Sequence, residues 1–256
     1  MTETLLEARG VRVLREARAV VDGVDLALAP GARVAIVGAN GSGKSTLLRS
    51  LRGLEPLASG EVKLAGASVT GLARVEIARR ATLVLQDTHV DVPITVRDLV
   101  ELGRFAHRGT PRAADDRAEI ERALQQTELP SLAARDVRTL SGGELQRVHL
   151  ARALAQACGV ILCDEPTSSL DLRHQLAVLA TLRAQAGAGR AVVVVLHDLT
   201  LAARWAERVV VLREGRVLAE GAPREVLTTE SVREAFGVEA RVTEVDGELV
   251  ITPRAR

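Results

Sequence analysis

The sequence lacks the features that mark several large classes of protein. Aromatic residues make up only 1% of its 256 residues, and tyrosine is absent. Its purest apolar run, AVVVVL at 191–196, falls far short of the about 20 residues that a membrane-spanning helix needs. The first ten residues, MTETLLEARG, lack the basic and then apolar layout of a signal peptide. We therefore expect a protein that works in the cytosol.

Charge and cysteine content exclude further classes. The 34 basic and 33 acidic residues leave a net charge of +1, whereas nucleic-acid-binding domains normally carry a basic excess. We therefore expect no nucleic-acid partner. The two cysteines, Cys158 and Cys163, have neither a CxxC nor a zinc spacing and lie in the apolar context ACGVILCDE. We interpret them as reduced core residues.

Apolar strands alternate with helical patterns along the chain, which favours an α/β fold with a mostly parallel, buried sheet. The strand candidates include 33–38, 81–86, 159–165 and 191–198. Residues 87–138 change in character and read as an inserted helical subdomain. We expect residues 1–86 and 139–256 to form the core. Two hairpin turns are predicted near its end, at Glu214–Gly215 and Asp246–Gly247.

The segment GANGSGKST fits the pattern of a phosphate-binding loop, G-x-x-x-x-G-K-[ST], between a predicted strand and a predicted helix. Backbone N–H groups and the helix dipole there would hold the phosphates of a nucleotide. Only Lys44 and Lys63 among the basic residues are lysines, which indicates that arginine cannot serve at position 44. The alternative is a glycine-rich turn with a chance lysine. The predicted phosphate-binding residues are Gly38, Ala39, Asn40, Gly41, Ser42, Gly43, Lys44, Ser45 and Thr46.

Two adjacent acidic residues, Asp164 and Glu165, end the predicted strand in GVILCDEP. Because neighbouring residues at a strand end point in different directions, Asp164 can serve a Mg²⁺ ion while Glu165 faces the terminal phosphate. Glu165 is then the candidate to polarise an attacking water. Alone, the pair could equally be a solvated sheet edge.

A second turn, LSGGE, opens the helix that follows residue 141. Ser141 and Glu144 have the spacing of a capping box, so the simplest interpretation is a well-capped helix. That interpretation leaves Gly142 and Gly143 unexplained, because glycine weakens a first turn. Two glycines make sense where an anion must approach the backbone closely.

Together GANGSGKST, LSGGELQ, ILCDEPTSSLD and VVLHD resemble the ATP-binding subunits of ABC transporters, in that family's order and over nearly the whole chain. The resemblance implies a P-loop NTPase core with an antiparallel β subdomain and a helical insert. It also implies ATP hydrolysis and a head-to-tail dimer with a second copy of the chain. In that dimer each ATP lies between the P-loop of one copy and the LSGGE turn of the other.

The resemblance carries specific roles to matching residues. Lys44, Glu165 and His197 would be catalytic, with Glu165 as the base and His197 on the terminal phosphate. Mg²⁺ would be held by Ser45, Gln86 and Asp164. The opposite ATP would be reached by Ser141, Gly142 and Gly143, with Asp171 crossing the dimer interface. Without these neighbouring motifs, His197 would be interpreted as a capping residue at the end of a strand. The other histidines, His89, His107, His149 and His174, are interpreted as surface or packing residues.

One position departs from the family pattern. An aromatic residue usually precedes the strand that leads to the P-loop and stacks on adenine. Here the matching position in VRVLREARAVVDG is Arg15. A guanidinium can stack on a base, so we expect Arg15 to hold the adenine. The alternative is weaker adenine binding, or tolerance of other nucleotides.

The segments TVRDLVELGRFAHRG and GAPREVLTTESVREAFGV resemble the branch that serves importers of iron-siderophores, haem and cobalamin. That branch implies a peripheral subunit on the cytoplasmic face of the membrane, bound to permease subunits and indirectly to a substrate-binding protein. Charge changes around 87–97 are expected to uncouple hydrolysis from transport. The alternative is a soluble ATPase of iron–sulfur cluster assembly.

Overall fold

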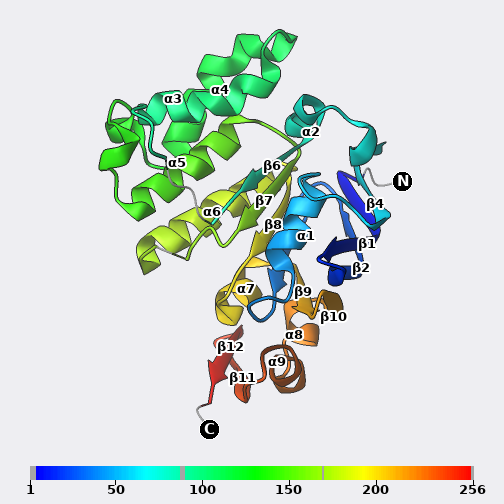
Figure 1. The fold of residues 1–256 in the computed structure, drawn as a ribbon. Helices are drawn as coiled ribbons and strands as arrows, with labels where there is room; N and C mark the ends of the chain where they lie inside the picture. Colours follow the sequence, from blue (N-terminus) through cyan, green and yellow to red (C-terminus); the bar gives the residue numbers. More distant parts are fainter. Residues whose placement is uncertain (1–3, 87–89, 169, 255–256) are drawn as a thin grey trace.

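The computed structural model describes residues 4–86, 90–168 and 170–254. A six-stranded sheet of order β10-β9-β3-β8-β7-β6 forms its centre (Figure 1). Its strands are parallel except β10, which pairs antiparallel with β9. Their bounds are β3 Arg33–Val37, β6 Ala81–Val84, β7 Val160–Asp164, β8 Ala191–Val195, β9 Arg208–Arg213 and β10 Arg216–Gly221. The predicted parallel sheet is therefore confirmed.

The central strands are apolar throughout because both faces of the sheet are covered. Every residue of β7 and of β8 is buried. Such unbroken apolar runs are typical of parallel strands between two layers. The prediction for the edge strand was too long at its end: β6 pairs with β7 only as far as Val84, and Gln86 lies beyond it.

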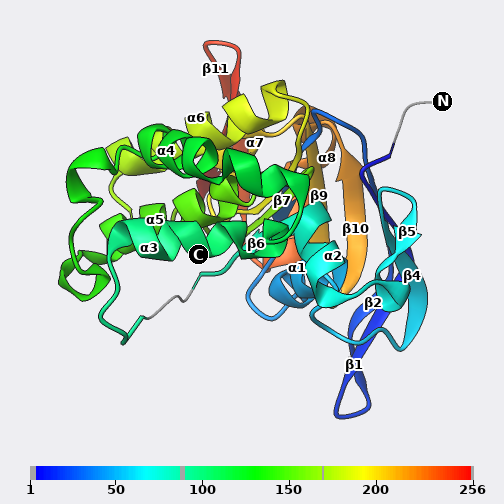
Figure 2. The same cartoon turned by 90° about the horizontal axis from the view of Figure 1, so that it is seen from above.

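An antiparallel sheet of order β2-β1-β4-β5 covers one side of the central sheet (Figure 2). Its strands are β1 Leu6–Arg15, β2 Arg18–Leu28, β4 Ser59–Leu64 and β5 Ala67–Ser68. Val24, Leu26 and Leu28 of β2 are buried in alternation with exposed neighbours, as their period predicts. This face and helix α1 (Lys44–Leu51) share one core cluster with β3, β7 and β8. The cluster fixes the helix that follows the phosphate loop.

Helices cover the opposite side of the central sheet (Figure 2). They are α3 Val96–Glu101, α4 Asp116–Gln126, α5 Gly142–Ala155, α6 Leu172–Gly187 and α7 Leu199–Trp205. Short 3₁₀ turns join them: η2 Leu102–His107, η3 Pro111–Asp115, η4 Pro130–Leu132 and η5 Val137–Thr139. The helix α5 packs on both α3 and α4. The subdomain bounds at 87 and 138 stay a prediction, and residues 87–89 lie outside the described residues.

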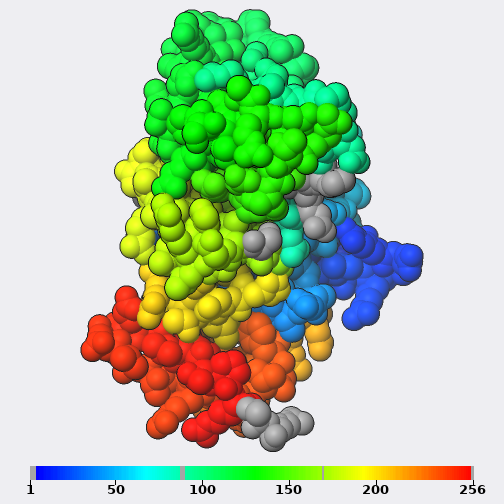
Figure 3. All heavy atoms as spheres, turned by 90° about the vertical axis from the view of Figure 1, so that its left-hand side faces the viewer, coloured from blue at the N-terminus to red at the C-terminus, as the bar shows by residue number. Residues whose placement is uncertain are grey.

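Both predicted hairpin turns are confirmed. Residues Glu214–Gly215 join β9 to β10, and Asp246–Gly247 join β11 (Ala240–Val245) to β12 (Glu248–Pro253), all with positive φ. Two positive φ angles define the turn whose twist suits a hairpin. The remaining helices are η1 Val69–Gly71, α2 Arg74–Arg80, α8 Pro223–Val226 and α9 Thr229–Phe236. In the space-filling view the last hairpin and the helical region lie at opposite ends of the molecule (Figure 3).

The cysteines are core residues, as expected. Both thiols are free and buried, and burial raises the pKa of Cys158 to about 11. No helix in the described part of the chain is long and apolar enough to cross a membrane.

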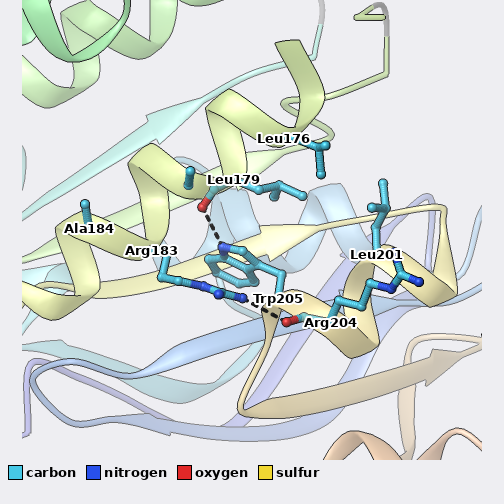
Figure 4. A pocket seen from close by; sticks show the side chains of 8 residues that line it. Leu176, Leu179, Arg183, Ala184, Leu201, Arg204 and Trp205 are labelled. Atoms are coloured by element: carbon cyan, nitrogen blue, oxygen red, sulfur yellow. Dashed lines mark hydrogen bonds between the residues drawn. The ribbon is translucent and has the colours of Figure 1, made fainter. Parts of the chain in front are cut away.

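The single tryptophan of the sequence ties α6 to α7. Trp205 is 2% exposed, and its indole N–H donates a hydrogen bond of 2.9 Å to the Leu179 carbonyl (Figure 4). An apolar cavity of 450 Å³ lies beside it, between these two helices. Since tyrosine is absent, Trp205 emission can report unfolding of the whole domain.

We expect Leu162→Ala to lower the free energy of unfolding by about 2–5 kcal/mol, because it leaves a cavity between two layers. Leu162 is 0% exposed on β7. The measurement is a urea titration followed by Trp205 emission. Leu54→Ala is the control, because Leu54 is 57% exposed and should change stability by no more than about 0.5 kcal/mol. Equal losses in the two variants would contradict the packing described here.

Candidate functional site

The phosphate loop runs from the end of β3 to the start of α1, in the strand–loop–helix order that its pattern predicts. Its first and third glycines are needed for close backbone approach. A Cβ at Gly38 would lie 2.3 Å from the Leu212 carbonyl oxygen, and one at Gly43 would lie 2.4 Å from that of Val20. Both have positive φ. No other residue fits these two positions without displacing the strands behind them.

Lys44 lies at the centre of the loop. Its ammonium donates hydrogen bonds of 2.9 Å to the carbonyls of Gly38 and Ala39. Burial lowers the pKa of Lys44, while the carboxylates of Glu165 and Asp164 oppose that shift. The first turn of α1 contains no acidic residue and has no side-chain cap, so its N–H groups remain available to an anion.

The loop approaches the end of β7 at Ser45. The Ser45 hydroxyl lies near Asp164 and opposes the rise in the Asp164 pKa that burial causes. One carboxylate oxygen of Asp164, Oδ1, is buried without a hydrogen-bond partner. An unpaired buried carboxylate oxygen beside a serine hydroxyl suits Mg²⁺, which binds one or two carboxylates together with substrate phosphates. Gln86 follows β6, the neighbour of β7, at the same edge of the sheet.

Among the described residues no group of three or more His, Cys, Asp or Glu side chains could hold a metal ion by itself. The predicted ligands Ser45, Asp164 and Gln86 offer oxygen atoms, which are the donors that Mg²⁺ prefers.

Glu165 contacts the histidine predicted to work with it. Its Oε1 forms an ion-pair contact with Nε2 of His197, which follows the end of β8. Glu165 is buried and has a φ of 50°, in the left-handed region, whereas the His197 side chain is 46% exposed. The structure thus brings Lys44, Ser45, Asp164, Glu165 and His197 to one end of the sheet. A buried base, a cation and a metal-binding oxygen set can together transfer a phosphoryl group to water.

The turn LSGGE forms the predicted capping box. The Ser141 N–H donates to Glu144 over 2.8 Å, and the Glu144 N–H donates to the Ser141 hydroxyl over 3.3 Å. Ser141 and Gly142 are exposed, and a Cβ added at Gly142 would meet nothing within 4 Å. This turn does not line the cavity that lies beside the phosphate loop, between that loop, the start of β2 and α9. Asp171 is also exposed and caps α6 by accepting from the His174 N–H at 2.9 Å.

A cavity of 470 Å³ lies beside the phosphate loop. Its walls come from the loop, from the start of β2, from the β9–β10 turn and from α9. Arg15 is not among the lining residues, because its guanidinium is paired with Glu55 at 2.6 Å. Arg18, which pairs with Arg15 across the β1–β2 turn, does line the cavity, as does Arg213. Neither Arg18 nor Arg213 was among the predicted site residues, because neither belongs to a motif.

The model of a protein family described as ABC transporter matches residues 21–168 of the chain. A Halobacterium salinarum protein named Cobalamin import ATP-binding protein BtuD is 44% identical over 251 residues, covering 97% of this chain but 63% of that relative. The chain therefore spans less than two thirds of that protein's length. A Streptomyces coelicolor protein named Hemin import ATP-binding protein HmuV is 45% identical over 234 residues, covering 91% of this chain and 84% of the relative.

Solved structures show the same fold. A metal-chelate type ABC transporter in an inward-facing conformation has a TM-score of 0.83 and 27% identity, with 99% of this chain and 98% of that chain covered. The dimeric cassette MJ0796, in a post-hydrolysis state with ADP and Pi, has a TM-score of 0.75 and 31% identity, with 86% and 99% covered.

Arg18 lines the cavity beside the phosphate loop, where its guanidinium could stack on the adenine of ATP. We expect Arg18→Ala to raise the Kd for ATP roughly tenfold, because stacking of a base on a side chain is worth ~1–3 kcal/mol. Arg15→Ala is the matched control, since the Glu55 ion pair already holds its guanidinium. The measurement is equilibrium binding of a fluorescent ATP analogue. A loss in Arg15→Ala without one in Arg18→Ala would instead support the assignment made from the sequence.

Proposed function

Since the chain belongs to the ABC transporter family, we propose that it is the ATP-hydrolysing subunit that powers an importer. The observation that carries this proposal is the Glu165–His197 contact beside the buried Asp164 carboxylate, near which Ser45 lies. A metal-binding oxygen pair and a buried base would then face a bound terminal phosphate. A nucleotide-binding module without catalysis would need no such base.

Each residue of the site then has a defined task. Lys44 exchanges its two loop carbonyls for phosphate oxygens, because it lies within reach of both. Ser45, Asp164 and Gln86 would hold Mg²⁺, which supplies charge neutralisation to the phosphates when it is bound. Glu165 orients the attacking water and accepts its proton. His197 holds the Glu165 carboxylate and reaches the terminal phosphate from the neighbouring strand.

We further propose that the complete site needs a second copy of the chain. The turn at Ser141, Gly142 and Gly143, of which Ser141 and Gly142 are exposed, does not line the cavity beside the phosphate loop of its own chain. In a head-to-tail dimer that turn would reach the ATP bound on the P-loop of the partner, and Asp171 would lie across the interface. The solved structure of MJ0796, a dimeric cassette with ADP and Pi, supports the association of two copies. Closure of the two copies on ATP would then drive a permease between its access states.

The cargo is proposed from the relatives alone. Proteins named for hemin import and for cobalamin import match nearly the whole chain, so haem, cobalamin or an iron-siderophore is the proposed cargo class. These names favour an importer over the cluster-assembly alternative. In such an assembly the chain would lie on the cytoplasmic face of the membrane, bound to permease subunits, with a substrate-binding protein on the other side.

The permease would bind the helical region beside Gln86. Of the segment predicted for this contact, Asp87, Thr88 and His89 lie outside the described residues. The described part that follows exposes Val92, and η2 exposes Leu102 and Phe105. Apolar side chains exposed in one region are typical of a protein interface.

We expect purification of the tagged chain from its native membranes in mild detergent to yield a stoichiometric polytopic membrane protein. Mass spectrometry identifies that protein, and its sequence narrows the cargo. A tagged Lys44→Ala chain is the control, because loss of nucleotide binding should not remove the permease. A soluble iron–sulfur scaffold in place of the membrane protein would contradict the proposal.

We expect a mixture of Lys44→Ala and Ser141→Arg chains to regain ATPase activity that neither has alone. In a head-to-tail heterodimer one site combines the intact P-loop of one copy with the intact LSGGE turn of the other. If the chains pair at random, about half of the dimers are heterodimers, and each has one intact site of its two. We therefore expect roughly a quarter of the parent activity. Steady-state phosphate release in the presence of the permease is the measurement. No gain on mixing would show that the two motifs do not share one ATP between copies.

A further inference from the structure

A second cavity is formed by residues that lie outside the phosphate loop, and several of them are basic. Its volume is 490 Å³, and it is formed between α2 and the η2–η3 segment. None of the residues assigned to ATP or Mg²⁺ lines it. The basic side chains in its wall are Arg79, Arg80, His107 and Arg112.

The arginines of this cavity outnumber its carboxylate. Among the described residues, no ion pair includes Arg79, Arg80 or Arg112, and Nη1 of Arg80 is buried without a hydrogen-bond partner. The one carboxylate in the wall, Glu76, accepts the Ala73 N–H as part of a helix cap. The wall therefore carries three guanidinium groups and one carboxylate. Uncompensated guanidinium groups in a concave site are the arrangement that binds a carboxylate or phosphate.

His107 is a buried part of the cavity wall. It is 1% exposed, its Nε2 lies 2.8 Å from the Gln156 carbonyl oxygen, and its Nδ1 is buried without a partner. Burial lowers the pKa of His107, with a smaller contribution from the cations of Arg104, Arg112 and Arg79, which favours the neutral ring. Because Nε2–H donates to the carbonyl, Nδ1 is an acceptor, so the arginines and not His107 would hold an anion in the cavity.

The η2 segment, which brings His107 to the cavity wall, also exposes two apolar side chains. Leu102 and Phe105, on the same η2 segment as His107, are 48% and 61% exposed. The Arg108 guanidinium lies over the Phe105 ring, 5.1 Å from its centroid. Exposed aromatic and aliphatic side chains beside arginines are typical of the centre of a protein–protein interface. A free phosphate ion would make no use of them.

We propose that this cavity receives an aspartate or glutamate side chain from a cytoplasmic loop of the permease, while Leu102 and Phe105 pack against the apolar part of the same loop. The inference rests on the proposed function, because it takes the permease as the partner. It adds the chemical group of the permease that is recognised, which is one acidic side chain bound by Arg79, Arg80 and Arg112. The acidic side chain gives specificity and the apolar pair gives contact area.

The first test is charge reversal at the rim. Arg112→Glu is chosen because Arg112 is exposed, so that the fold should survive, and Arg241→Glu is the matched control on the distant β11. Binding of each chain to proteoliposomes that contain the co-purified permease is measured by sedimentation. We expect Arg112→Glu to weaken binding at least about tenfold and Arg241→Glu to leave it unchanged. Binding of ATP in solution should be equal in all three chains.

The outcomes separate the two proposals. Parent-like binding of Arg112→Glu overturns the inference and leaves the proposed function intact. Failure of the parent chain itself to bind the permease overturns both. Vesicles of phosphatidylcholine and phosphatidylserine without permease form a further arm. If they bind the parent but not Arg112→Glu, the anion is a lipid headgroup and the acidic side chain is excluded.

A second test names the acidic residue. Because the chain has only two lysines, Arg112→Lys places a nearly unique amine in the cavity. A carbodiimide activates a carboxylate, and an amine in contact with it then forms an amide as the urea leaves. We expect a cross-link between Lys at position 112 and an Asp or Glu of the permease, absent from the parent and from Arg241→Lys. Exchange of that acid for arginine should restore binding to Arg112→Glu. Equal cross-linking of Arg241→Lys, or no restoration, would overturn the inference.

Discussion

The site depends on the approach of Ser45 to Asp164, where the serine hydroxyl opposes the rise in the pKa of the buried carboxyl group. This approach brings the first turn of α1 to the end of β7, two elements that the chain forms more than a hundred residues apart. The Asp164 carboxylate stays buried because the strands on both sides of β7 and the two layers around the sheet exclude water. The same burial leaves one of its oxygens unpaired. A polar group kept in this state costs stability unless a ligand completes it, so the fold is arranged for an occupant.

The parts of the site that local chemistry determines were predictable from the sequence. The glycines of the phosphate loop, the capping box at Ser141 and both hairpin turns depend on a few neighbouring residues, and the structure contains each of them. The fold class followed from the unbroken apolar runs of β7 and β8. Such features need no knowledge of distant contacts, because backbone sterics and strand burial act at short range.

The remaining features depend on contacts between segments that are far apart in the sequence. Arg15 and Arg18 are equivalent by type, and only the ion pair of Arg15 with Glu55 distinguishes them. The basic cavity is assembled from α2 and the η2–η3 segment, neither of which carries a motif. His107 was interpreted as a surface or packing residue. It is indeed packed, but its unpartnered nitrogen is a property of the assembled fold.

Glu165 shows how far the site departs from what the backbone prefers. Its φ of 50° belongs to a region that costs a residue with a side chain about 1 kcal/mol or more, and that glycine or asparagine occupies more readily. The turn is nevertheless what aims the carboxylate at His197 instead of along the strand. Selection for stability alone would therefore replace this residue. A redesign that scores only folding energy would stabilise the protein here while removing the proposed base, so thermostability and turnover make opposite demands on this position.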